Sequence, residues 1–103
     1  MSKVLVVESH RGLRNAILKL LEGMGIEPIE ASGTEEIYRY DIDLVITDAA
    51  NGKDLPDTTV PVLVISPSAK DNDKNVHYIR QPFEVGELCN TVMKLTSSVL
   101  ARS

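Results

Sequence analysis

The chain has 103 residues, of which 43% are hydrophobic and 25% charged, and its formal net charge is -4. This length predicts one domain over residues 1–103, and the longest apolar runs are too short to cross a bilayer. Because the 11 basic residues are scattered along an acidic chain, we expect no direct binding of nucleic acid. A single cysteine excludes an internal disulfide, and with no signal peptide at the N-terminus the expected location is the cytoplasm.

The chain begins with a strand and an amphipathic helix. Residues 4–7 are a continuous β-branched and leucine run, which ends on Glu8 and Ser9. Over residues 10–25 the apolar side chains recur at helical spacing, so this segment is predicted to be a helix. Ser9 is its expected N-cap, and Gly25 is its expected left-handed terminator.

Two further strands follow, separated by a short helix. Residues 26–31 alternate in polarity and contain a proline, which predicts an edge strand. A helix of barely two turns is expected over residues 35–40, with Thr34 as its cap. Residues 44–47 are all apolar or β-branched and precede Asp48, so they predict a strand that is buried on both faces.

The next two connections are too polar and too short for full helices. Residues 49–59 are dense in turn formers, and a βαβ crossover with its helix needs about a dozen residues or more. Residues 60–65 predict a fourth strand ending on Ser66. Residues 67–75 can hold one helical turn at most, and residues 76–80 predict the fifth strand.

A long helix is expected at the end of the chain, from residue 84 to about residue 100. Acidic residues come early in this segment and a lysine comes late, as the helix dipole favours. Its predicted core face consists of Val85, Leu88, Val92, Leu95 and Val99. The order of elements predicts an α/β domain with a mostly parallel sheet.

Asp48 is the first candidate for a chemical role, because it follows a buried strand at its carboxyl end. In open parallel sheets, ligands bind at this edge, where the loops leave the strands. An alternative interpretation is that Asp48 only caps the next turn by accepting hydrogen bonds from backbone N–H groups.

Five features occur together along the chain. They are the acid after the first strand, the Asp after the third, a hydroxyl after the fourth, an aromatic residue in the fifth and an X-Pro-Phe sequence before the last helix: Glu8, Asp48, Ser66, Tyr78 and Gln81-Pro82-Phe83. In this order and placement they resemble response regulator receiver domains, and the resemblance extends from Lys3 to about Leu100. The resemblance implies a flavodoxin-like five-stranded parallel sheet of order 2-1-3-4-5, here with the third and fourth helices shortened or missing.

The resemblance also implies a non-enzymatic signalling domain of a two-component or phosphorelay pathway. In the family, the aspartate at the position of Asp48 accepts a phosphoryl group from a histidine kinase. Acids at the first strand hold Mg²⁺, the hydroxyl matched by Ser66 hydrogen-bonds the phosphate, and the aromatic residue matched by Tyr78 rotates as a switch. The expected metal site here is a weak one made by Glu8 and Asp48.

Two residues of the expected site depart from the family pattern. Ser9 replaces the second acid, and a hydroxyl is a poor ligand for a hard divalent cation. Gln81 replaces a lysine and can donate a hydrogen bond, but it brings no charge to a phosphoryl dianion. Each missing charge-assisted hydrogen bond corresponds to about 1.5–3 kcal/mol.

These departures leave two main hypotheses open. The chain is either a receiver phosphorylated at Asp48 or a phosphorylation-independent pseudo-receiver that binds another protein. A small flavodoxin-like enzyme or nucleotide binder is a third hypothesis, but the loop after Glu8 lacks a G-x-G pattern. His10 and His77 have no ligand spacing to Cys89, which argues against zinc.

The fifth strand and the last helix form the expected interaction face. The residues assigned to it are Tyr78, Phe83, Leu88 and Val92. Cys89 and Met93 add apolar surface on the same helix. Because two helices are reduced, we expect a partner protein or a second copy of the chain to cover apolar surface, so a homodimer through this face is one expectation.

Overall fold

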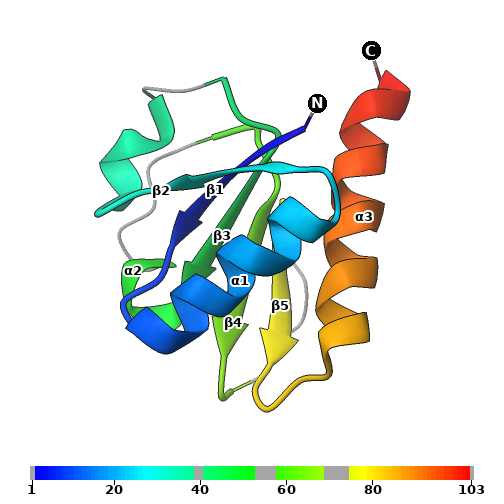
Figure 1. Ribbon diagram of the computed structural model, residues 1–103. Helices are drawn as coiled ribbons and strands as arrows, with labels where there is room; N and C mark the ends of the chain where they lie inside the picture. The colour runs from blue at the N-terminus through cyan, green and yellow to red at the C-terminus, as the bar shows by residue number, and fades with distance from the viewer. Residues whose placement is uncertain (1, 39–40, 53–57, 69–74, 103) are drawn as a thin grey trace.

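Five strands form one parallel sheet in the order β2-β1-β3-β4-β5, as expected from the sequence (Figure 1). The computed structural model describes residues 2–38, 41–52, 58–68 and 75–102. The strands are β1 (Lys3–Val7), β2 (Glu27–Glu30), β3 (Leu44–Asp48), β4 (Val62–Ser66) and β5 (Val76–Arg80). The helices are α1 (Arg11–Gly23), the 3₁₀ helix η1 (Thr34–Tyr38), α2 (Ala49–Gly52) and α3 (Val85–Arg102).

The three inner strands are buried on both faces, which explains their continuous apolar sequences. β1 pairs with β2 and β3, and β3 pairs with β1 and β4, all in parallel. Leu44, Val45 and Ile46 have no exposed surface, and Thr47 has none either. A strand of this kind has no wet side, so alternation of polarity is absent from its sequence. The prediction for residues 44–47 is confirmed.

The two long helices pack on one face of the sheet. In Figure 1, α1 crosses in front of the strands and α3 lies beside β5. Ile17 and Leu21 of α1 and Leu88 of α3 meet this face in one hydrophobic cluster. The strand side chains in the cluster include Val6, Ile46, Leu63, Ile65 and Ile79. This face therefore has two full helices over it.

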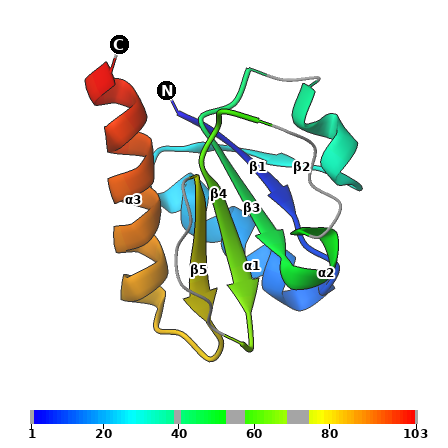
Figure 2. The same ribbon diagram turned by 180° about the vertical axis from the view of Figure 1, so that it is seen from behind.

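The other face of the sheet carries only short helical segments in the part of the chain that the structure describes. Ile37 of η1 and Ala49 of α2 pack against the cluster of Leu5, Val7, Val45, Val62 and Val64. In Figure 2 these segments lie beside β1 and β3, and neither of them lies in front of β5. The predicted reduction of the third helix is confirmed, because α2 is a single turn.

The first helix begins one residue later than expected, and its cap is a different residue. His10 is the N-cap, and its Nδ1 accepts a hydrogen bond from the Leu13 backbone N–H at 3.1 Å. Ser9 was predicted to be the cap, but its own N–H donates to carboxylates of the neighbouring site. Gly25 has φ +77° just after the helix, which confirms its predicted role as the left-handed terminator.

Other boundaries also differ from those expected. The short helix is a 3₁₀ helix over Thr34–Tyr38. Residues 39–40 of the expected helix and the side chain of Thr34 lie outside the described residues. The fourth strand begins at Val62 rather than residue 60. Most of the polar segment 67–75 is outside the described residues.

The last helix departs from its expected core face at its first turn. Leu88, Val92 and Leu95 are buried as predicted, but Val85 is 58% exposed. Val85 is the first helical residue, and its exposure shows that the prediction was wrong for this position. The side chain of Val99 is outside the described part.

Among the described residues, no helix is both long enough and apolar enough to span a membrane.

Candidate functional site

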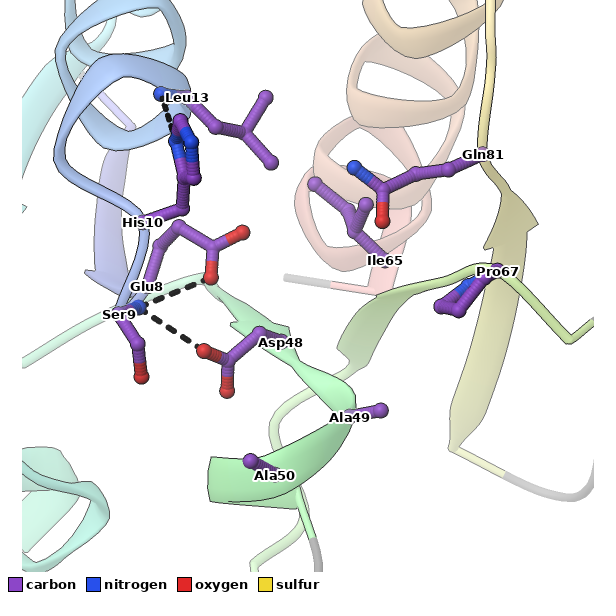
Figure 3. Close-up of a pocket in the computed structure, with 10 residues that line it drawn as sticks. All are labelled: Glu8, Ser9, His10, Leu13, Asp48, Ala49, Ala50, Ile65, Pro67 and Gln81. Atoms are coloured by element: carbon purple, nitrogen blue, oxygen red, sulfur yellow. Dashed lines mark hydrogen bonds between the residues drawn. The ribbon is translucent and has the colours of Figure 1, made fainter.

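The carboxyl ends of β1 and β3 bring Glu8, Ser9 and Asp48 together. The two strands are parallel neighbours, with Val7 paired to Thr47, so the residues that follow them emerge at the same edge of the sheet. A pocket of about 350 Å³ opens there between the start of α1, the start of α2 and the end of β5 (Figure 3). The predicted proximity of Glu8 and Asp48 is therefore observed.

The carboxylate of Asp48 is held by hydrogen-bond donors from two loops. Its Oδ2 accepts the backbone N–H of Ser9 at 2.9 Å. Its Oδ1 accepts both the backbone N–H and the side-chain Nδ2 of Asn51, each at 2.8 Å. Asp48 thus caps the single turn of α2 while it lines the pocket, so both interpretations of this residue describe part of its environment.

Glu8 is buried, with 6% of its surface exposed, and it lies beside Asp48. The backbone N–H of Ser9 donates to Glu8 Oε2 at 2.9 Å as well as to Asp48 Oδ2, so one donor lies between the two carboxyl groups (Figure 3). A side chain of Glu rarely has so little exposure without a partner. The shared donor thus holds two carboxyl groups close together at a site that is partly shielded from solvent.

The two acids respond to this arrangement in opposite ways. Burial, a hydrogen bond with Asp48 and the charge of Asp48 together raise the pKa of Glu8 to about 7, and burial is the largest of these causes. Burial also acts to raise the pKa of Asp48, but hydrogen bonds from Glu8, Asn51 and Ser9 outweigh it and bring that pKa to about 2. Near neutral pH, Asp48 is a carboxylate and Glu8 is partly protonated.

The pocket walls are apolar and neutral apart from the two acids and one histidine. Gln81 lies across the opening from Glu8 and Asp48 (Figure 3), and the peptide bond between Gln81 and Pro82 is cis. No lysine or arginine is among the pocket residues, which are Glu8, Ser9, His10, Leu13, Asp48, Ala49, Ala50, Ile65, Pro67 and Gln81. Within this pocket, a bound anion would meet no lysine or arginine side chain.

Two other predicted site residues lie apart from the pocket. Ser66 ends β4 and is buried, but its Oγ accepts the backbone N–H of Ser68 at 3.1 Å, and the residue does not line the pocket. Tyr78 is half-buried and packs against the cluster on the opposite face of the sheet from α1. The structure thus joins Glu8, Asp48 and Gln81 and leaves Ser66 and Tyr78 outside the pocket.

The predicted interaction face is only partly at the surface. Leu88 and Val92 are 2% and 1% exposed because they point from α3 into the core, so assigning these two residues to a binding face was wrong. Tyr78 and Phe83 are half-buried.

Three residues near the site were not expected to shape it. Asn51 binds Asp48 through two N–H groups and also donates from Nδ2 to Ser9 Oγ at 3.1 Å. His10 caps α1 at the pocket, and Arg14 Nη1 donates to the Glu8 carbonyl at 3.2 Å. The three-residue spacing from Asp48 to Asn51, common for a cap and a residue in the first turn, could have identified the first of these contacts.

The donor set does not fit Mg²⁺. This ion requires near-octahedral oxygen coordination and is bound mainly by carboxylates and water. The pocket offers Glu8, which is partly protonated near neutral pH, and Asp48, whose oxygens already accept three N–H groups. In the described ranges, no three Asp, Glu, His or Cys side chains are grouped so that they could hold a metal ion.

Comparisons with known proteins identify the fold. No sequence-family model matches the chain, and no curated protein matches it by sequence. It is similar to the solved receiver domain of the hybrid histidine kinase CckA, with a TM-score of 0.75 and 26% identity over 92% of this chain and 99% of that one. A response regulator from Thermotoga maritima has a TM-score of 0.71 and 27% identity over 94% and 98% of the two chains.

A third solved structure is similar in fold alone. It is the receiver domain of a sensor histidine kinase from Pseudomonas aeruginosa, described with a magnesium ion in its active-site cleft. Its TM-score is 0.71 at 16% identity, over 93% of this chain and 98% of that one.

The parallel strand order β2-β1-β3-β4-β5 defines a flavodoxin-like α/β domain with the fold of a receiver. The similarity covers more than nine tenths of the chain and of the solved receiver domains. The chain has the receiver fold in a short form and is similar to response regulator receiver domains, which are found in two-component and phosphorelay systems.

Proposed function

We propose that this receiver domain works without phosphorylation, as a pseudo-receiver that binds another signalling protein of a two-component or phosphorelay pathway. The supporting observation is the set of groups around Asp48. Its carboxylate is bound by Ser9 and Asn51, which are neutral donors, and Gln81 is the residue across the pocket. Such a site holds an aspartate firmly without preparing it to carry added negative charge.

An acyl phosphate on Asp48 would increase the negative charge of this pocket. A phosphoryl group on Asp48 would bring close to two negative charges into a pocket that already contains Glu8. Without a lysine and a second metal-binding acid, two charge-assisted interactions of about 1.5–3 kcal/mol each are absent. The acyl phosphate would therefore form slowly and be poorly stabilised.

The alternative function is a receiver phosphorylated at Asp48 by a histidine kinase or phosphorelay protein. One observation favours it: the pKa of Asp48 is about 2, so the carboxylate is ionised and faces an open pocket. An ionised carboxylate is the form that attacks a phosphoryl donor. In this alternative, Gln81 and Ser66 would supply neutral hydrogen bonds to the phosphoryl oxygens, and Mg²⁺ would be weakly held.

Phosphorylation with a small-molecule donor separates the two functions. The chain is incubated with acetyl phosphate and Mg²⁺, and its intact mass is followed. We expect no added phosphoryl group on the wild type and measurable addition to the double variant Ser9→Asp/Gln81→Lys, in which both charges return. Asp48→Asn in the same background is the control for the modified residue. Phosphorylation of the wild type at Asp48 would contradict the proposal and support the alternative.

A second experiment tests the signalling role itself. The pathway output of the host is compared between the wild type, Asp48→Asn and a deletion of the gene. The proposed function predicts that Asp48→Asn keeps the output, since the two side chains have the same shape and Asn can still accept hydrogen bonds through its Oδ1. Loss of output in both strains would indicate the phosphorylated alternative.

The proposal also covers the cellular location and the partner of the domain. The domain is proposed to act in the cytoplasm without enzymatic activity of its own, in keeping with the single cysteine and the acidic composition. Its partner is proposed to be a histidine kinase, a phosphorelay protein or another signalling protein, with no direct contact to nucleic acid. The surface around Tyr78 and Phe83 is the proposed contact face.

A further inference from the structure

We propose that the side-chain amide of Asn51 takes the place of a divalent cation in this site and, with Ser9, excludes Mg²⁺ from the Glu8–Asp48 pair. The inference rests on the proposed phosphorylation-independent function and deepens it, because it names the residue that keeps the site without metal. Ser9 stands where a second carboxylate ligand would be needed. The side chain of Asn51 fills the space beside Asp48.

The first step is the position of the amide nitrogen. Asn51 Nδ2 lies 2.8 Å from Asp48 Oδ1 and 3.1 Å from Ser9 Oγ, so it bridges the acid and the hydroxyl that replaces the second acid. A cation held between Asp48 Oδ1 and the side chain of residue 9 would need to occupy the position of this amide group. An NH₂ group carries partial positive charge and only donates hydrogen bonds, so it satisfies these oxygens and cannot itself bind a cation.

The second step is the state of the Asp48 oxygens. Oδ1 accepts two N–H groups of Asn51, one from the backbone and one from the side chain, which uses both of its lone pairs. Oδ2 accepts the N–H of Ser9, which also donates to Glu8 Oε2. A metal ion would therefore have to displace existing hydrogen bonds before it could gain a carboxylate ligand.

The third step is the cost of that displacement. The backbone N–H of Asn51 is fixed at the start of α2, three residues after Asp48, and its side chain folds back onto the same carboxylate. Removing the side chain would free the lone pair nearest to Ser9 without removing the backbone donor. Loss of the Asn51 amide would thus open a position for a cation between Asp48 Oδ1 and Ser9 Oγ.

The experiment is a Mg²⁺ titration of the full chain, followed by amide NMR at Glu8, Ser9 and Asp48. We expect no saturable shifts in the wild type at millimolar Mg²⁺. In the Ser9→Asp background, where the missing acid is restored, Asn51→Ala should tighten Mg²⁺ binding by at least about tenfold, because the metal no longer competes with a hydrogen bond to a carboxylate.

Two further variants keep the test sound. Asn51→Ser removes the amide and retains a small polar side chain at the start of α2, in case the alanine variant is unstable. Asn75→Ala is the matched control, because Asn75 donates to the Thr58 carbonyl far from the acids, and it should leave Mg²⁺ binding unchanged.

The outcomes distinguish the inference from the proposed function. Saturable Mg²⁺ binding by the wild type, or equal affinity with and without Asn51 in the Ser9→Asp background, would overturn the inference. If the wild type binds Mg²⁺ and acetyl phosphate still does not modify it, the inference fails while the phosphorylation-independent function stands. If Mg²⁺ does not bind but Asp48 is phosphorylated, the proposed function fails while the inference stands.

Discussion

At the scale of single residues, one backbone N–H sets the chemistry of the site. The N–H of Ser9 donates to Glu8 and to Asp48, so the two carboxyl groups meet at a common donor. Two acids so close cannot both ionise easily, and the one with more donors ionises first. Asp48 has these donors, and the proton remains on Glu8.

The pH dependence of Glu8 is the first prediction. Its pKa of about 7 lies above the ordinary value of 4.5, so the folded protein binds this proton more tightly than the unfolded chain. The free energy of unfolding should therefore fall as pH rises from 4.5 to 7. An NMR titration of the side-chain carboxyl carbon measures the pKa, and urea unfolding at each pH measures the stability.

Asp48 has the opposite effect on the free energy of unfolding, which should rise with pH in the acidic range where Asp48 titrates. Its pKa of about 2 lies below the ordinary value of 3.8, so its contribution to stability is lost as pH falls from 3.8 to 2. The two groups together place the highest stability between these ranges. Asp48→Asn is the control, since it removes a charge beside Glu8 and should lower the pKa of Glu8. A pKa of Glu8 near 4.5 in the wild type would contradict the prediction.

The cap of α1 gives the second prediction. Because His10 Nδ1 accepts the Leu13 N–H, His10→Ala should reduce the free energy of unfolding by about 1 kcal/mol. His10→Asn should retain most of it, since an asparagine oxygen can accept the same hydrogen bond. Urea unfolding of the three proteins checks the order, and equal stability of alanine and asparagine variants would show that the cap contributes little.

The sequence predicts the acids of the site better than the polar residues around them. Glu8 and Asp48 were found because strands of uninterrupted apolar residues end on them, and parallel strands end at a common edge. The contacts of Asn51 were harder to predict, because they depend on the backbone conformation of the single turn of α2. Ser66 follows its strand in the same way, but its hydroxyl binds Ser68 instead of facing the pocket.

At the scale of elements, α1 shows how two neighbouring glycines differ. Gly23 is the last residue of the helix, and a methyl group there would meet no atom within 4 Å. Gly25 has φ +77°, a conformation in which a side chain is strained even though space is open. The same substitution at the two positions should therefore have opposite effects.

This contrast is the third prediction. Gly25→Ala should destabilise the protein by about 1–2 kcal/mol, because it forces an L-residue into the left-handed region. Gly23→Ala should be neutral or stabilise it by up to about 1 kcal/mol, because alanine restricts the unfolded chain and favours the helix. Thermal unfolding of both variants measures the difference. Destabilisation by both to the same extent would mean that the backbone conformation at residue 25 is not the cause.

The elements themselves could be predicted where the apolar pattern is long. The fifth strand was predicted with its observed bounds, Val76–Arg80, and the inner strands followed from their β-branched runs. The ends of helices were harder to predict, because neighbouring polar residues can each act as the cap. His10 caps α1 in place of Ser9. The exposure of Val85 also could not be predicted from spacing, since apolar spacing does not show which turns of α3 are covered by the sheet.

At the scale of the whole molecule, the two faces of the sheet are covered unequally. One face has two full helices, and the other has η1 and a single turn of α2 among the described residues (Figures 1 and 2). Val76 and Tyr78 at that second face are half-buried, and Val85 and Met93 of α3 are 58% and 56% exposed. Apolar surface of this kind is the basis for expecting a partner protein or a second copy.

Self-association is the fourth prediction. Light scattering at increasing concentration should show a mass that rises above that of one chain. Val85→Glu/Met93→Glu should lower this tendency, because charged side chains replace the exposed apolar ones on α3. Lys94→Glu is the control, since it changes the charge of the same helix without removing apolar surface. A constant monomer mass in all three proteins would contradict the proposed homodimer.

The bounds of the domain can also be tested. That residues 1–103 form one domain stays a prediction, and limited proteolysis would test it. One protected fragment close to the full length is the expected result.

The strand order also has a consequence for the way the chain folds during synthesis. β1 lies between β2 and β3, so the strand of this domain that is synthesised before its other four becomes an inner strand, and it has both neighbours only after Asp48 has been synthesised. β5, made much later, pairs only with β4. Because pairing between distant segments is slow to form, nascent chains that stop before β3 should remain open to chaperones and proteases.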